Sequence, residues 1–296
     1  MSQKHPVVAV TGSSGAGTST VKKAFEHIFR RETITPVIVE GDSFHAFDRA
    51  AMKVEMEKHE AAGNRFFSHF GENANEFGKL AELFESYSKK GSGKKRYYLH
   101  SEPEAVEHNA RLGVDKKPGE FTPWEDIESG SDLMFYEGLH GLVKTENHDI
   151  AQHVDLGIGV VPIVNLEWIQ KIHRDRDQRG YSTEAITDVI LRRMDAYVNC
   201  ITPQFSETDI NFQRVPVVDT SNPFIARSIP TPDESLVVIR FKDPHGIDFR
   251  YLTAMIEGSW MSRANSIVVP GGKMDLAMQL ILTPLILRLA DNAKRA

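Results

Sequence analysis

The stretch Val8–Thr20, VAVTGSSGAGTST, decides how the rest of this chain is interpreted. The β-branched run that starts at Val7 predicts a buried strand, and closely spaced glycines and a helical pattern follow it. Together these elements make a phosphate cradle, because glycines let the backbone bend around an anion and a helix N-terminus adds partial positive charge. The spacing matches G-x-x-x-x-G-K-[ST], except that Thr18 replaces the lysine. A tight turn without a ligand is the alternative interpretation.

Composition limits the class of protein. The chain has 296 residues and a net charge of −6, which argues against non-specific binding of nucleic acid. No apolar run reaches the ~18 residues of a membrane span, and the N-terminus lacks an apolar signal segment. We therefore expect a cytoplasmic protein. Cys200 is the single cysteine, so no disulfide can form within the chain.

Hydrophobic patterning predicts alternating strands and helices in one domain over residues 1–296. Such alternation favours an α/β fold with a mixed, mostly parallel sheet and helices on both faces. We expect Asn165 and Ser182 to cap helices, and residues 101–127 to be rich in turns. The expected strands are 7–11, 37–40, 97–100, 133–136, 158–164, 215–218, 235–241 and 266–269, and the expected helices are 19–31, 47–62, 73–89, 166–178, 183–198 and 273–292.

Three polar groups are expected beyond the carboxyl ends of the parallel strands, where such sheets bind ligands. They are the glycine loop, Asp42 and Glu137. Ser19 occupies the position of the hydroxyl that binds Mg²⁺ in phosphate loops, and Glu137 could hold that metal directly or through water. An exposed acid at a strand end is the alternative for Glu137.

Asp42, His45 and Arg49 follow the second predicted strand. Asp42 is placed to take a proton from a hydroxyl that attacks the γ-phosphate. If a helix has begun there, His45 and Arg49 share one face and could hold an anionic group of the acceptor. The alternative is an N-capping aspartate with two solvated neighbours.

The segment 171–179, KIHRDRDQR, is a charge cluster on a predicted helix. Lys171, Arg174, Asp175 and Gln178 share one helical face. A solvated face with internal ion pairs is the usual interpretation of such a run. Here the loop lacks its lysine, and phosphoryl transfer requires positive charge at the γ-phosphate, which Lys171 or Arg174 could supply.

Together these residues resemble the bacterial type of phosphoribulokinase, a P-loop NTPase-type kinase. The resemblance covers essentially the whole chain. The matching stretches are VTGSSGAGTSTV (10–21), EGDSFHAFDR (40–49), FYEGLHG (135–141), NLEWIQKIHRDRDQRGY (165–181), DVILRRMDAYV (188–198), FQRVPVVDTSNPFIAR (212–227) and HGIDFRYL with GSWMSRANSIVVPGGKMDLAMQLILTP (within 245–284).

The resemblance implies transfer of the ATP γ-phosphate to the C1 hydroxyl of D-ribulose 5-phosphate in the Calvin cycle, with Mg²⁺. It implies that Asp42 is the base, that Asp175 is a second essential carboxylate, and that Lys171 stabilises the transition state. It makes Glu137 a metal-binding acid and His45, Arg49, Arg174 and Arg179 contacts of the sugar phosphate. The implied ATP-binding residues are Gly12, Ser13, Ser14, Gly15, Ala16, Gly17, Thr18, Ser19 and Thr20.

The same resemblance implies a homo-oligomer, typically an octamer, that NADH activates and AMP inhibits. Among the surface or intersubunit cations expected at Arg192, Arg193, Arg240 and Arg263, it makes Arg192, Arg240 and Arg263 candidates for the effector site. Two other functions remain open. A uridine kinase-like nucleoside kinase would phosphorylate a neutral acceptor, and the missing lysine at Thr18 suggests a non-catalytic ATP-binding regulator.

Overall fold

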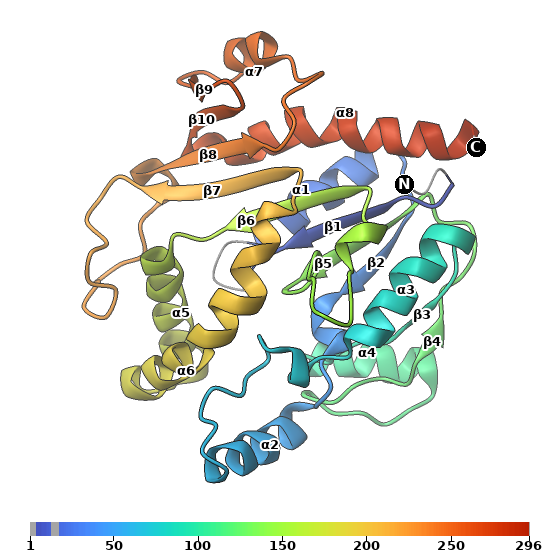
Figure 1. Ribbon diagram of the computed structural model, residues 1–296, viewed down its shortest axis with the longest axis vertical. Helices are drawn as coiled ribbons and strands as arrows, with labels where there is room; N and C mark the ends of the chain where they lie inside the picture. Colours follow the sequence, from blue (N-terminus) through green and yellow to red (C-terminus); the bar gives the residue numbers. More distant parts are fainter. Residues whose placement is uncertain (1–3, 13–17, 296) are drawn as a thin grey trace.

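The computed structural model describes residues 4–12 and 18–295, and the side chains of Thr18, Ser19, Thr20, Gln178 and Arg179 lie outside the described residues. An eight-stranded sheet in the order β2-β5-β1-β6-β7-β8-β10-β9 forms its centre (Figure 1). The main strands are β1 (Val7–Thr11), β2 (Pro36–Glu40), β5 (Leu133–Gly138), β6 (Leu156–Val161), β7 (Ile210–Pro216), β8 (Ser235–Phe241), β9 (Trp260–Arg263) and β10 (Ser266–Pro270).

The sheet is parallel in its first half and antiparallel in its second. The pairings from β2 through β5, β1 and β6 to β7 are parallel. Those from β7 through β8 and β10 to β9 are antiparallel. This mixed sheet confirms the predicted fold class, and its parallel half carries the polar residues that the sequence singled out.

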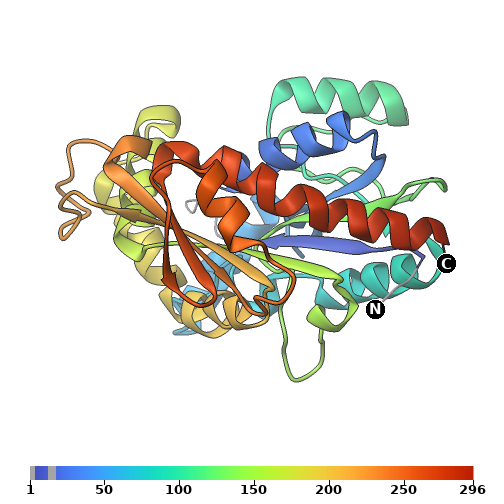
Figure 2. The ribbon, with the colours of Figure 1, turned by 90° about the horizontal axis from the view of Figure 1, so that it is seen from above.

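Helices cover both faces of the sheet. The α-helices are α1 (Thr18–Arg31), α2 (Arg49–Ala61), α3 (Phe77–Lys90), α4 (Glu102–Leu112), α5 (Val164–Arg179), α6 (Thr183–Ala196), α7 (Phe249–Met255) and α8 (Met274–Arg295). On one face α1, α7 and α8 pack in one core with β1, and Figure 2 shows α1 and α8 side by side on it. On the other, α3 and the segment 142–154 pack against the alternate side chains of β1. Both sides of β1 are therefore buried, as its β-branched sequence predicts.

Several local predictions were wrong. Residues 97–100 form no strand and contribute one bridge, between Tyr98 and Phe121. The turn-rich segment contains α4, with a proline in its first turn, where the missing N–H costs nothing. Asn165 does not cap α5, because the chain turns helical immediately after Ile163. The strand expected to reach residue 164 ends at Val161, before Pro162.

Other local predictions are confirmed. The side chain of Ser182 accepts a hydrogen bond from the Ala185 backbone N–H and caps α6. By contrast, the sequence pattern suggested a kink or a helix junction at Pro284, and the junction is wrong, because α8 continues through Pro284 as one helix. Cys200 is the free cysteine and is partly buried, and that burial raises the pKa of its thiol. Within the described residues, no helix is long and apolar enough to cross a membrane.

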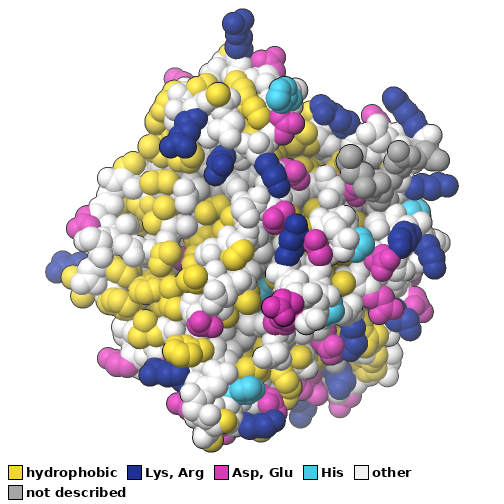
Figure 3. Space-filling model, viewed as in Figure 1, with side chains coloured by type: hydrophobic (Ala, Val, Ile, Leu, Met, Phe, Trp, Pro, Cys, Tyr) yellow, Lys and Arg dark blue, Asp and Glu magenta, His cyan; other side chains and the backbone are white. Residues whose placement is uncertain are grey.

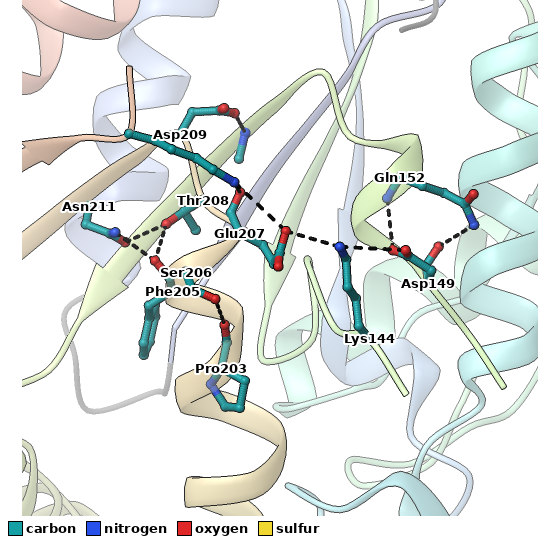
Figure 4. A network of polar contacts seen from close by, with 12 residues as sticks. Lys144, Asp149, Gln152, Pro203, Phe205, Ser206, Glu207, Thr208, Asp209 and Asn211 are labelled. Atoms are coloured by element: carbon teal, nitrogen blue, oxygen red, sulfur yellow. Dashed lines mark hydrogen bonds and ion pairs between the residues drawn. The ribbon is translucent and has the colours of Figure 1, made fainter. Parts of the chain in front are cut away.

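Polar contacts fasten the amino ends of β6 and β7 (Figure 4). The Asp209 carboxylate accepts a hydrogen bond from the Gly157 backbone N–H at 2.7 Å. Nearby, Lys144 Nζ lies 3.1 Å from Glu207 Oε2 and 3.7 Å from Asp149 Oδ2. Because these strands run parallel to β1, this network lies at the edge opposite their carboxyl ends. The network connects the loops at this edge. The edge at the carboxyl ends of the parallel strands carries none of these contacts and is the one at which such sheets bind ligands.

Candidate active site

The candidate site lies where β2, β5 and β1 end together. Val10 of β1 and Glu40 of β2 both pair in register with Glu137 of β5. The backbone N–H of Gly12 donates to the Gly138 carbonyl oxygen at 3.2 Å. The start of the glycine loop, the turn that carries Asp42, and Glu137 are therefore neighbours, as the strand order required.

Much of the predicted ATP cradle lies outside the described residues. This applies to Ser13–Gly17, and to the side chains of Thr18, Ser19 and Thr20 at the start of α1. Their contacts with nucleotide and metal remain predictions. The described part shows the strand before the loop and the helix after it, and this is the context that distinguishes a phosphate cradle from an ordinary turn.

Two glycines allow the Asp42 turn to sit directly on the end of β5. A Cβ atom on Gly41 would lie 2.8 Å from the Gly138 Cα and 2.5 Å from the Tyr136 hydroxyl oxygen. A Cβ atom on Gly138 would lie 2.6 Å from the Gly41 Cα. Any side chain at either position would push the turn away from Glu137. This close approach explains why glycines precede Asp42 and follow Glu137.

Asp42 lies between two imidazoles. Its Oδ1 is 3.7 Å from His45 Nε2, and its Oδ2 is 3.8 Å from His100 Nε2. The Asp42 side chain is 42% exposed, so a substrate hydroxyl could approach it. His45 is buried, whereas the His100 side chain is 45% exposed. The structure thus confirms that Asp42 and His45 are neighbours and adds His100, to which the sequence assigned no role.

Two buried histidines, His45 and His140, and the partly buried His69 lie near Asp42. The rings of His45 and His69 have centroids 4.3 Å apart, and His140 Nε2 lies 3.3 Å from the His69 carbonyl oxygen. Burial lowers the pKa of His45 and of His69 to about 3, and the pKa of His140 to about 4. All three are therefore neutral at pH 7. His45 would contact an acceptor as a neutral imidazole rather than as a cation.

The charge cluster on α5 forms as the sequence predicted. Lys171 Nζ pairs with Asp175 Oδ2, and Arg174 Nε lies 3.0 Å from Asp175 Oδ1. Burial and the nearby Arg193 lower the pKa of Lys171 to about 8. Burial alone would raise the pKa of Asp175, but Lys171 and Arg174 hold it below its usual value. The Asp175 side chain is only 4% exposed, so this is not a solvated face.

Arg193 is not the solvated surface cation that the sequence suggested. Its guanidinium lies 5.0 Å from the centre of the Phe70 ring and is desolvated, which lowers its pKa. Its charge lowers the pKa of both Lys171 and His45. Arg193 therefore lies between the α5 cluster and the histidines around Asp42. Sequence patterning could not show this, because Arg192 and Arg193 point to different neighbours.

The three candidate effector arginines do not come together within the chain. Arg192 is buried and pairs with Glu60 of α2 at 3.0 Å and with Asp188 at 3.4 Å, so it is not a surface cation. Arg240 and Arg263 are exposed and both pair in register with Ser266, on the strands that flank it. Figure 1 shows α2 at the opposite end of the molecule from β8 and β9.

The sequence also missed an ion pair close to Glu137. Lys22 Nζ of α1 lies 2.7 Å from Glu40 Oε1. Burial opposes the charge of Lys22, but Glu40 and Glu137 raise its pKa above the usual value. Among residues 4–12 and 18–295, no group of three or more metal-ligating side chains is formed. A single carboxylate such as Glu137 is compatible with Mg²⁺, which commonly takes one or two carboxylates and completes its shell with phosphates and water.

Comparison with known proteins shows the family to which this chain belongs. A family model described as "Phosphoribulokinase / Uridine kinase family" matches residues 7–221. The chain belongs to the phosphoribulokinase and uridine kinase family. It is 65% identical over 296 residues to phosphoribulokinase 2 of Cereibacter sphaeroides, covering 100% of this chain and 99% of that one. It is 62% identical over 296 residues to the chromosomal phosphoribulokinase of Cupriavidus necator, with 100% and 99% covered.

A solved structure of this family has the same fold over its whole length. The phosphoribulokinase from Rhodobacter spheroides matches with a TM-score of 0.89 and 63% sequence identity. The match covers 99% of this chain and 100% of that one. Likeness at this level extends beyond the shared kinase core to the antiparallel half of the sheet, which the family model does not reach.

Acid should destabilise this protein through His45, His69 and His140. Their folded pKa values of about 3, 3 and 4 lie below the 6.5 of an unfolded histidine, so the unfolded chain binds more protons below pH 6.5. The stability present above pH 6.5 is then lost as the pH falls toward 4. We expect a loss of about 2 kcal/mol per histidine between pH 7 and pH 5, measured by urea unfolding.

The control for this pH dependence is an exposed histidine. His69→Gln should flatten the dependence of the free energy of unfolding on pH, whereas His27→Gln, on the exposed side of α1, should leave it unchanged. Equal slopes in the two variants would contradict the assignment of acid sensitivity to the buried cluster.

Proposed function

We propose that this protein transfers the γ-phosphoryl group of ATP to the C1 hydroxyl of D-ribulose 5-phosphate, giving D-ribulose 1,5-bisphosphate and ADP for the Calvin cycle. The observation that carries this proposal is the identity of 65% to a phosphoribulokinase over the full chain. The matched region includes both parts of the site, the sheet edge with Asp42 and the α5 cluster.

Asp42 is the general base in this proposal. Its carboxylate is half-exposed, and its neighbours are imidazoles more than 3.5 Å away. Asp175, by contrast, is buried and has both oxygens bound by Lys171 and Arg174. A carboxylate held by two cations is a poor proton acceptor, because its pKa is lowered. Asp175 instead holds the two cations in place.

Lys171 supplies the positive charge that the glycine loop lacks at Thr18. Its side chain is 12% exposed and is held by Asp175, so its ammonium group is desolvated and fixed. Such a charge stabilises the transferring phosphoryl group better than a solvated one, because little reorganisation is needed. Arg193 is partly buried and lies close enough to lower the pKa of Lys171, so it adds to the positive potential on the same side of the site.

The acceptor binds between these two groups in our proposal. Arg49 is exposed at the first turn of α2, and Arg174 and Arg179 come from α5. These cations would hold the 5-phosphate, and His45 would donate a hydrogen bond as a neutral imidazole. The Arg179 side chain lies outside the described residues, so its part rests on the resemblance.

Mg²⁺ would be held by Glu137 and by Ser19, whose side chain is not among the described ones. The ion would neutralise charge on the β- and γ-phosphate oxygens. Within the protein, Glu137 is kept at the end of β5 by its register with Val10 and Glu40. Lys22 lies close enough to Glu40 and Glu137 for electrostatic interaction with both carboxylates.

We also propose that the protein is a cytoplasmic homo-oligomer, an octamer by family resemblance, that responds to NADH and AMP. The loop between β7 and β8 exposes Val217, Val218, Phe224, Ile225 and Ile229. Hydrophobic side chains are frequent on that side of the molecule in Figure 3. Exposed apolar groups of this kind favour contact between subunits. Arg240 and Arg263 remain the exposed candidates for effector binding.

The choice of acceptor separates the proposed function from its alternatives. In an assay coupled to ADP release, we expect turnover with ribulose 5-phosphate and none with uridine, because the site is rich in cations. Turnover with uridine alone would make the protein a nucleoside kinase. Absence of turnover with either acceptor, in protein that binds ATP, would favour the non-catalytic regulator.

Asp42→Asn should remove the proton acceptor and keep the shape of the side chain. We expect kcat to fall on the order of 10²–10⁴-fold, with the KM for ATP changed less than about twofold. Asp48→Asn is the matched control, because Asp48 caps α2 and asparagine caps equally well. A comparable loss of ATP binding in Asp42→Asn would show that Asp42 acts on the nucleotide or metal instead.

Lys171→Met should remove the charge and keep the length of the side chain. We expect kcat to fall about 10²–10³-fold, with smaller changes in the KM of either substrate. Lys144→Met, which breaks an ion pair at the opposite edge of the sheet, should leave kcat unchanged. Unchanged turnover in Lys171→Met would show that the missing charge at Thr18 is supplied elsewhere.

A further inference from the structure

A guanidinium group lies behind the turn that carries Asp42. Arg96 Nε donates a hydrogen bond to the Ser43 carbonyl oxygen at 2.8 Å, and Arg96 Nη2 donates to the His45 carbonyl oxygen at 2.7 Å. Both distances are short for N–H···O bonds, as expected when the donor is charged. One planar group therefore holds two carbonyls of the turn at once.

Two aromatic rings hold the same guanidinium. Its central carbon lies 3.7 Å from the centre of the Phe121 ring and 4.6 Å from the centre of a Trp124 ring. Trp124 also contacts Phe44 of the turn edge-on, with centroids 5.5 Å apart. Rings contact the guanidinium and carbonyls bind its N–H groups, so Arg96 has little freedom to turn. Arginine suits this arrangement because its planar fork can stack and bond simultaneously.

The segment that carries Arg96 is itself fixed to its neighbours. The Leu99 backbone N–H donates to the Glu120 carbonyl oxygen at 3.0 Å, and the Tyr97 N–H donates to Thr122 Oγ1 at 2.9 Å. On the same side, the Gly119 carbonyl oxygen accepts from the Arg49 N–H at 2.9 Å. Residues 96–122 therefore hold the chain at both ends of the stretch from Ser43 to Arg49.

Arg96 makes no ion pair with a carboxylate among residues 4–12 and 18–295. Burial lowers its pKa, and the more distant Glu76 opposes this only in part. A partly desolvated cation without a carboxylate partner is costly, and here the two carbonyls and two rings offset that cost. The contacts of Arg96 are therefore those of a residue that binds the turn, and not those of a surface ion pair.

We infer that Arg96 is a positioning residue for the phosphoryl transfer, which holds the turn so that the Asp42 carboxylate faces the acceptor. It acts through the carbonyls of Ser43 and His45 and does not touch the reacting atoms. This inference rests on the proposed role of Asp42 as base. A role in folding alone is the competing explanation.

The test compares Arg96→Met and Arg96→Lys with Arg111→Met. Arg111 belongs to the same part of the chain, pairs with Glu125 at 2.8 Å and lies over the Tyr97 ring, but does not contact the turn. We expect kcat with ribulose 5-phosphate to fall at least about tenfold in Arg96→Met and several-fold in Arg96→Lys, since lysine keeps the charge but loses the fork. The KM for ATP should stay within about twofold, and Arg111→Met should match the wild type.

A combined variant separates positioning from folding. If Arg96 acts through Asp42, Arg96→Lys should reduce kcat less than about twofold further in an Asp42→Asn background, because the base is already absent. Losses that multiply would overturn the inference, as would a wild-type kcat in Arg96→Lys accompanied only by a lower unfolding midpoint. Should Arg96→Met fail to fold, Arg96→Lys decides alone.

The wild-type control keeps this inference distinct from the proposed function. Turnover of ribulose 5-phosphate by the wild type tests the function, and the ratio of variant to wild type tests Arg96. Wild-type turnover with an unchanged ratio in both Arg96 variants would refute the positioning role and leave the function intact.

Discussion

The site depends on a backbone contact between two glycines at the end of the parallel strands. Gly41 and Gly138 approach so closely that neither tolerates a Cβ atom. The same Gly138 accepts a hydrogen bond from Gly12, at the start of the phosphate loop. The loop, the Asp42 turn and Glu137 are thus held together by main-chain contacts that side-chain motion cannot loosen. Everything else in the site is arranged around this edge.

Around that edge the protein separates two electrostatic environments. Near Asp42, burial keeps the imidazoles of His45 and His140 neutral at pH 7. On α5 and α6 the positive charge is concentrated, with Lys171 and Arg174 fixed by Asp175. The proposed proton acceptor and the proposed cationic phosphoryl site therefore have different electrostatic surroundings. Arg193 lies between the two environments and lowers the pKa of Lys171 in one and of His45 in the other.

The sequence predicted those parts of the site that depend on the spacing of residues close together in the chain. The strand before Gly12, the polar turn after Glu40 and the helical face of the α5 cluster all follow from spacing over a few residues. It failed on Arg193, His69 and Arg96, because each takes its role from partners that are distant along the chain. The Arg96 carbonyl partners lie 53 and 51 residues away, which no periodicity could reveal. The fold class was predictable because alternation of elements is also a local property.

By itself the sequence predicted a phosphate-binding loop that lacks its lysine. It also predicted that Asp42 and Glu137 follow or end parallel strands at the same edge of the sheet. Only the tertiary structure decided which cations are buried at the site and which pair elsewhere. Arg192 and Arg193 are adjacent in the chain, yet one binds Glu60 and the other lies over Phe70. The physical reason is that successive side chains on a helix point in different directions, so the packing of α6 against its neighbours assigns each cation its environment.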